Sequence, residues 1–227
     1  MRSPTAIGVV ATCFFTLVGA PPHSMAATFT IDGVSVELPV PAGFCEMTTS
    51  DPSDRLMIDK IGQLMARASG GRLLAISADC QQLADWRAGK RLLADYGQYS
   101  APRATAASAD SFRQQCAVMR LRGGELDADT KGDVKSRLEE FIKGSKVTEQ
   151  SFVGFFGEDP AACYMATLPK AKSQAGTDVV QLMLLAVARV KDKLVIVNRY
   201  APYVDAETVN DTLTKLKSTV ATILAAN

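Results

Sequence analysis

The sequence predicts an α+β fold: a largely antiparallel sheet with helices packed on it, an opening β-hairpin and a long C-terminal amphipathic helix. Three observations favour this class. An alternating stretch surrounds Asp32-Gly33 near the start, apolar strand-like segments fill most of residues 151–200, and an apolar stripe of helical period follows Asp205. This order of hairpin, helices, antiparallel strands and final helix is typical of α+β proteins.

The chain opens with a predicted hairpin. Residues 28–38 alternate apolar and polar side chains around Asp32-Gly33, a dipeptide that strongly favours a two-residue hairpin turn. Pro39 and Pro41 follow and end the second strand, because proline cannot donate to a strand ladder.

A helix is predicted over residues 51–68. Asp51-Pro52 has the pattern of a helix start, with proline in the first turn, and apolar residues then recur at helical spacing. Gly70-Gly71 ends the segment.

The next elements are a strand and three helices. Residues 72–78 form a short apolar run that predicts a buried strand. Asp79, with Gln82 three residues later, resembles a capping box that opens a helix. Further helices are predicted over residues 108–121 and 133–142.

The second half of the chain predicts two hairpins. Residues 151–156 and 162–168 flank one loop, and residues 179–190 and 194–200 flank another. Residues 180–190 are apolar almost throughout, so we expect a central strand covered on both faces.

The last segment predicts an amphipathic helix capped by Asp205. Its polar face carries Asp211, Lys215 and Lys217 with several threonines, not the basic or aromatic band of a membrane-binding helix. We therefore expect it to pack on the sheet. The apolar stripe comprises Val209, Leu213, Leu216, Val220, Ile223 and Leu224.

Residues 1–26 have the charged, apolar and small-residue order of a secretory signal peptide, and residues 27–227 are expected to form one α+β domain. The Ser-Met-Ala sequence that ends at Ala26 predicts cleavage there, with Ala27 as the alternative. The apolar run of about 15 residues is shorter than the roughly 20 that cross a bilayer. A retained membrane anchor, or a lipid anchor at Cys13, is the less favoured alternative.

The charge balance excludes some partners. Lys and Arg total 25 and Asp and Glu total 24, and the basic residues lie among acidic ones instead of forming a stripe. Nucleic-acid binding is therefore not expected. No transmembrane segment is expected after removal of the signal peptide.

Histidine chemistry is absent from the predicted mature chain, because the single histidine, His23, lies in the leader. Serine–histidine and cysteine–histidine triads and most zinc or iron sites need that residue. The run of residues 127–133 resembles the start of a calcium loop, but Lys131 and Leu138 occupy ligand positions. No metal site and no cofactor are expected, and the chain is not expected to be an enzyme.

One type of enzyme needs no histidine. Glycosidase-type hydrolysis uses two carboxylates, and the adjacent pairs Glu158-Asp159 and Glu139-Glu140 could supply them. Nothing in the sequence positions either pair, so a hydrolase is kept as the alternative.

Four cysteines remain after loss of the leader: Cys45, Cys80, Cys116 and Cys163. Their wide spacing and the predicted export favour structural disulfides over redox or zinc motifs. If residues 34–40 and 72–78 are parallel strands joined by a helical crossover, Cys45 and Cys80 follow strand ends at one sheet edge. This predicts Cys45–Cys80 and, by elimination, Cys116–Cys163. Buried free thiols are the alternative.

Residues 34–44, with the sequence V-S-V-E-L-P-V-P-A-G-F, resemble the strand and P-x-G-aromatic opening of PsbP-like domains. The resemblance implies an exported α+β domain with a non-catalytic accessory or binding role, often beside a membrane complex. We therefore expect a periplasmic or secreted accessory or binding protein with an envelope protein as partner; the sequence names no small-molecule ligand. A structural envelope-interaction protein is a further alternative.

Overall fold

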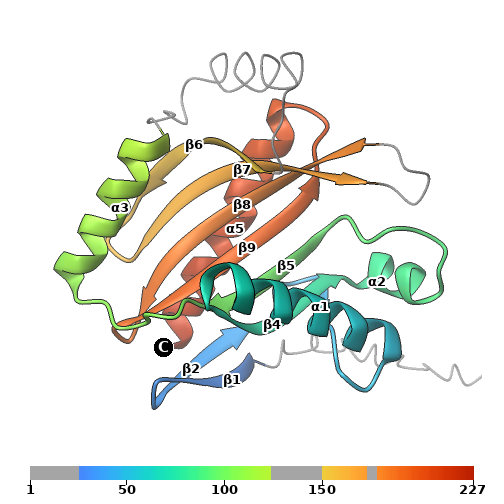
Figure 1. The fold of residues 1–227 in the computed structure, drawn as a ribbon, viewed down its shortest axis with the longest axis horizontal. Helices are drawn as coiled ribbons and strands as arrows, with labels where there is room; N and C mark the ends of the chain where they lie inside the picture. The colour runs from blue at the N-terminus through green and yellow to red at the C-terminus, as the bar shows by residue number, and fades with distance from the viewer. Residues whose placement is uncertain (1–25, 124–149, 173–177) are drawn as a thin grey trace, which may run out of the picture.

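The computed structural model of this 227-residue chain describes residues 26–123, 150–172 and 178–227. Residues 1–25 of the predicted leader, the helix predicted over residues 133–142, the calcium-loop-like run and the pair Glu139-Glu140 lie outside the described residues. Within them, a large antiparallel sheet with helices packed on it confirms the predicted α+β class (Figure 1).

The described strands are β1 (Ala26–Ile31), β2 (Val34–Pro39), β3 (Phe44–Glu46), β4 (Arg72–Asp79), β5 (Tyr96–Ala101), β6 (Gln150–Glu158), β7 (Ala162–Lys172), β8 (Asp178–Val190) and β9 (Lys193–Pro202). The described helices are α1 (Pro52–Ser69), α2 (Cys80–Arg87), α3 (Ala109–Gly123) and α5 (Ala206–Ala226). Among these helices, none is both long enough and apolar enough to cross a membrane.

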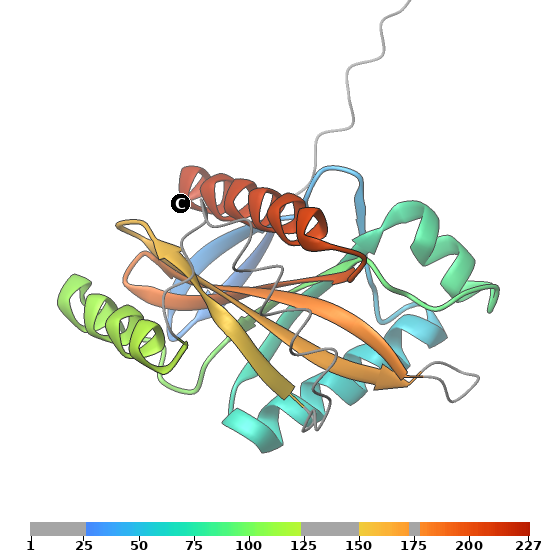
Figure 2. The same ribbon diagram turned by 90° about the horizontal axis from the view of Figure 1, so that it is seen from above.

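The main sheet has seven strands in the order β3-β4-β5-β9-β8-β7-β6, and every neighbouring pair is antiparallel. β8 lies between β7 and β9, as expected for its apolar sequence. Figure 2 shows α5 on one side of this sheet and α1 on the other.

The main core lies between α5 and the sheet. Leu182, Leu184 and Ala186 alternate along β8 toward this core, and Leu216 and Val220 of α5 belong to the same buried cluster. The alternating buried residues of β8 therefore pack against the apolar stripe of α5 that the sequence predicted. Each fully buried leucine contributes roughly 2 kcal/mol through loss of apolar surface from water.

The opening hairpin forms as predicted. Asp32 and Gly33 both have positive φ angles, of 45° and 79°, as a type I′ turn requires. Ala26, the predicted cleavage residue, is the first residue of β1 and pairs with Pro39. Val36 lies in the main core, so the hairpin extends the layer that α5 forms.

Smaller cores lie under the other helices. Ile76 and Leu83 form a cluster with half-buried residues of α1. Phe112 and Cys116 of α3 pack on Phe155 and other residues of the sheet.

The expected parallel crossover is wrong. Among the described strands, β2 pairs only with β1, in a separate two-stranded sheet, and a new strand, β3, pairs antiparallel with β4. Pro39 at the end of β2, Pro41 after it and the turn at Gly43, with φ of 79°, end the strand and redirect the chain before Phe44.

Only one of the two hydrogen bonds of the predicted capping box at α2 forms. Asp79 Oδ1 accepts a hydrogen bond from Gln82 N at 2.9 Å. The Gln82 side chain instead accepts from the backbone of Ala94 and Asp95, at 3.4 and 3.2 Å. It therefore fixes the segment that enters β5 and does not close the box.

Candidate functional site

The structure pairs Cys45 with Cys80 and Cys116 with Cys163, with Cα–Cα distances of 4.9 and 5.8 Å. Both distances fit disulfide geometry and the predicted connectivity. The first pair joins β3 to the start of α2, and Cys80 N also donates to Gly43 O at 3.1 Å. The segment before β3 is therefore held at two points.

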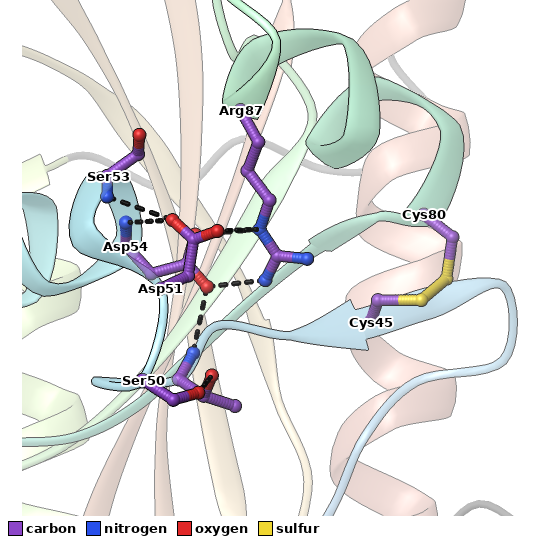
Figure 3. Close-up of polar contacts among 8 residues, drawn as sticks. Cys45, Ser50, Asp51, Ser53, Asp54, Cys80 and Arg87 are labelled. Carbon is purple, nitrogen blue, oxygen red and sulfur yellow. Dashed lines mark hydrogen bonds and ion pairs between the residues drawn. A yellow bond between two sulfur atoms is a disulfide. The ribbon is translucent and has the colours of Figure 1, made fainter.

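A buried carboxylate ties α1 to α2 beside this disulfide. Arg87 points from α2 toward the start of α1 (Figure 3) and donates from Nε to Asp54 Oδ1 at 3.0 Å and from Nη2 to Oδ2. Thr48 N donates to Oδ2 at 2.9 Å. Because the protein itself satisfies both oxygens of Asp54, this cluster is a structural brace.

A cleft of about 770 Å³ lies between residues 39–44 and α5. We call it the α5 cleft, and its volume is in the range of small-molecule sites. Its charged lining residues are Asp79, Asp95, Arg199 and Lys215. Its remaining lining comprises Pro39, Val40, Pro41, Ala42, Gly43, Phe44, Thr214, Ser218, Thr219 and Thr222.

The rim of the α5 cleft is held in place by the sheet below it. Tyr99 of β5 donates from its hydroxyl to Pro39 O at 2.7 Å. Phe44 N donates to Pro41 O at 3.0 Å and closes the turn that contains Gly43. These two hydrogen bonds hold the rim in place and position Phe44 beside the cleft.

Arg199 is the central polar group of the cleft. Its Nη2 lies 2.9 Å from Asp95 Oδ1, and its Cζ lies 3.9 Å from the centroid of the Phe44 ring. Only 7% of Arg199 is exposed. Three segments that are distant in sequence therefore meet around one buried guanidinium.

Two polar atoms of this pair lack a hydrogen-bond partner among the described residues: Arg199 Nε and Asp95 Oδ1. Arg199 Nη2 nevertheless lies 2.9 Å from Asp95 Oδ1, so the two charges form an ion pair. Both unpartnered atoms are buried, so a ligand in the cleft would contact other parts of these two side chains.

Burial also perturbs both charges. It raises the pKa of Asp95 above the ordinary value of 3.8, although Arg199 and Lys215 oppose the shift. Burial lowers the pKa of Arg199, and Asp95 opposes that change. Both directions show that loss of hydration outweighs the attraction within the pair.

A second cavity, of about 670 Å³, lies between α1 and β4. Its lining includes Ile58 of α1 and Leu73 and Ala75 of β4. None of its described lining residues carries a buried polar side-chain atom without a partner. Its charged lining residues, Glu46, Asp59 and Arg72, are exposed, whereas Arg199 in the α5 cleft is buried.

The predicted acids Glu158 and Asp159 each have partners elsewhere in the described structure. Glu158 pairs with Arg120 at 2.7 Å. Asp159 accepts from Ala161 N, Ala162 N and the Tyr164 hydroxyl at 2.8–2.9 Å and so closes the β6–β7 turn. Among the described residues, no group of three or more Cys, His, Asp or Glu side chains could hold a metal.

Sequence reasoning did not identify the α5 cleft. It treated Asp79 as a helix cap and Lys215 as part of a solvated helix face, and it gave Asp95 and Arg199 no role. The one available signal was Arg199 itself, because a charged residue within a buried strand is unusual.

No protein-family model and no curated protein matches the chain. Among solved structures, the chain is similar to the Ran-binding protein Mog1p of Saccharomyces cerevisiae, with a TM-score of 0.31 and 11% identity. That match covers 89% of this chain and 92% of Mog1p. At this level of similarity, the function of the α5 cleft has to be argued from its own geometry.

Proposed function

We propose that this chain is an exported, non-catalytic binding protein that holds a polar ligand in the α5 cleft. The observation that carries this proposal is the α5 cleft itself, a space of about 770 Å³ that is lined by the ion pair of Arg199 and Asp95 and by Lys215. Arginine forks recognise oxygen acceptors with defined geometry. The ordered rim and the stacked Phe44 favour a preformed site.

An accessory role in the cell envelope belongs to the same proposal. The leader-like residues 1–26 and the two cysteine pairs fit an oxidising, exported environment. The PsbP-like opening of residues 34–44 ends at Phe44, which lines the cleft. A protein partner in the periplasm or outside the cell would receive or deliver the ligand.

The test is retention of ligand by the protein purified from its own host. We expect native mass spectrometry to detect a small molecule that survives gentle desalting. The double variant R199Q/D95N replaces the charged pair with neutral amides and should lose this molecule. The matched control is R189Q/D192N, which neutralises an Arg–Asp pair at the β8–β9 turn, 2.6 Å apart and away from the cleft.

Absence of any retained or titratable ligand would contradict the proposal, as would equal retention by R199Q/D95N. A carboxylate hydrolase is the second candidate, because Asp79 and Asp95 line the same cleft. Asp79 is engaged as the cap of α2 and Asp95 lies against Arg199. Substrate turnover that is lost in Asp95→Asn would replace the binding role with this enzyme.

A further inference from the structure

The cavity between α1 and β4 runs along the edge of β4. Its lining includes every residue from Arg72 to Ile76. Successive side chains of a strand point to opposite faces of the sheet, so a cavity over one face would contact only alternate residues. Contact with all five residues places the cavity beside the strand, and we call it the edge groove.

This edge has room for another strand. β3 pairs with residues 77–79 of β4, and Met47 N donates to Ile76 O at 2.9 Å. The chain then leaves the sheet to form α1. Among the described strands, residues 72–75 of β4 therefore have a neighbour, β5, on one side only.

A bulge interrupts the β4–β5 ladder at the same place. The register shifts between Leu73 and Ala75, so Leu74 has no partner residue in β5. A bulge can turn an edge away from further pairing, but Leu74 lines the edge groove and is therefore open to a ligand. The backbone of an extended peptide matches the N–H and C=O groups of such an edge.

α1 forms the opposite wall of the edge groove. Ile58, Gly62 and Ala66 line it, and their spacing of four residues places them on one face of the helix. They span about 12 Å at 1.5 Å per residue, and residues 72–76 of β4 span about 13 Å at 3.3 Å per residue. The two walls therefore have nearly the same length, which fits a short extended segment.

Gly62 leaves space in the middle of the α1 wall. A Cβ added at this position would meet no atom within 4 Å outside the neighbouring helix backbone. Glycine in a helix interior costs roughly 1 kcal/mol relative to alanine. The space beside Gly62 gives room for side chains of an added strand.

The two ends of the edge groove differ in charge. Only Gly70 and Gly71 connect α1 to β4, so these two elements run in opposite directions. Asp59 therefore lies toward Glu46 at the β3 end, and Arg72 lies at the other end. Both acids are exposed, and neither forms an ion pair with a described residue. They attract a basic side chain, which would set the direction of a bound peptide more than its affinity.

We infer that the edge groove binds an extended segment of another protein, which pairs antiparallel with β4 in line with β3. In this direction the N-terminal end of the segment lies beside Glu46 and Asp59 and carries a basic residue there. Alternate side chains of the segment point toward the α1 wall. The edge groove shares no lining residue with the α5 cleft, so this inference goes beyond the proposed function and does not depend on it.

Selection from a phage-displayed library of random peptides against the oxidised full chain tests this inference. We expect enriched sequences in which apolar or β-branched residues alternate after a Lys or Arg, without proline inside the alternating run. The enriched peptide is then synthesised in two forms, each N-methylated at one of the two alternating sets of residues. A strand presents successive N–H groups to opposite sides, so one form should bind at least tenfold more weakly and the other should not.

Gly62→Leu fills the edge groove and should weaken binding of the synthetic peptide at least tenfold, measured by fluorescence anisotropy. Leucine favours a helix more than glycine does, and the position has open space, so urea unfolding should show equal or greater stability. The matched control is Ala68→Leu, which adds the same side chain at an exposed position of α1 outside the groove. It should leave peptide binding within about twofold.

The outcomes decide between strand addition and other kinds of contact. Failure to enrich any sequence, enrichment of proline-rich sequences, or equal binding of the two N-methylated forms would overturn the inference. Peptide binding that Gly62→Leu leaves unchanged would also overturn it. A dimer in sedimentation velocity that Gly62→Leu abolishes would replace the foreign segment with a second copy of this chain.

Discussion

Arg87 on α2 donates two hydrogen bonds to the carboxylate of Asp54 on α1, and this carboxylate has 0% exposure (Figure 3). The Arg87 side chain is 33% exposed, so the pair spans the boundary between the protein interior and solvent. Thr48 N completes the carboxylate shell. Through this pair the first two helices are fixed relative to one another and to β3.

Asp54→Ala is expected to lower the free energy of unfolding by roughly 3 kcal/mol, because removal of one partner of a buried pair leaves the other uncompensated. Partial exposure of Arg87 keeps the loss at the lower end of that range. Urea unfolding followed by circular dichroism measures it. Asp59→Ala, at an exposed position on the same helix, should change stability by less than about 0.5 kcal/mol. Equal stability of the two variants would show that the brace has no net effect.

Asn227 gives a second prediction, because its side chain pairs with the backbone of β2 as a strand would. Its Oδ1 accepts from Glu37 N at 2.9 Å and its Nδ2 donates to Glu37 O at 2.8 Å. Asn227→Ala should release this edge, cost roughly 1 kcal/mol and accelerate hydrogen exchange at the Glu37 amide. Asn210→Ala, within α5, is the control. Unchanged exchange at Glu37 in Asn227→Ala would mean that the edge is protected in another way.

The fold class and most described elements could be predicted because the residues that a strand or helix buries recur at a regular spacing in the sequence. The alternation around Asp32-Gly33 and the stripe after Asp205 each specify an element and the face that it buries. Periodicity does not specify which strands pair with one another, and the predicted parallel crossover was wrong for this reason. The cysteine pair survives this error, because β3 places Cys45 opposite Ala78, two residues before Cys80, in the antiparallel arrangement as well.

The α5 cleft could not be predicted for a related reason. Its floor combines Asp79, Asp95 and Arg199 from three separate segments, and no spacing in the sequence connects them. The spacing of hydrophobic residues predicts which side chains are buried, but it does not indicate which buried polar atoms lack a hydrogen-bond partner. Arg199, within the buried strand β9, is the position where a local rule fails, and such failures concentrate at functional sites.

Asp95 predicts an unusual pH dependence. Burial raises its pKa above 3.8, so the folded protein holds this proton more tightly than the unfolded chain does. The resulting contribution to stability is fully present below pH 3.8 and is lost as the pH rises through the higher pKa of the folded state. Urea unfolding between about pH 3.5 and 7 should therefore show the wild type losing stability relative to Asp95→Asn.

Direct titration of the Asp95 carboxyl carbon by NMR gives an independent check on the sign. An apparent pKa above 3.8 supports burial as the dominant cause. A value below 3.8 would show that Arg199 dominates, and the stability difference between wild type and Asp95→Asn would then have the opposite slope.

The two cysteine pairs should be separable by function. Their sequence separations are 35 and 47 residues, so the chain-entropy model assigns each about 4 kcal/mol of stabilisation. Only Cys45–Cys80 borders the α5 cleft, because Cys45 follows Phe44 and Cys80 follows Asp79. C45A/C80A is therefore expected to lower stability and also to weaken ligand retention at least tenfold.

C116A/C163A is the matched comparison, since that pair joins α3 to β7 within a separate buried cluster. It should lower stability by a similar amount and leave ligand retention within about twofold, because no residue of that cluster lines the cleft. Native mass spectrometry and urea unfolding of both double variants measure the two effects side by side. Equal loss of ligand in both would show that the cleft depends on global stability and not on the local anchor of Phe44 and Asp79.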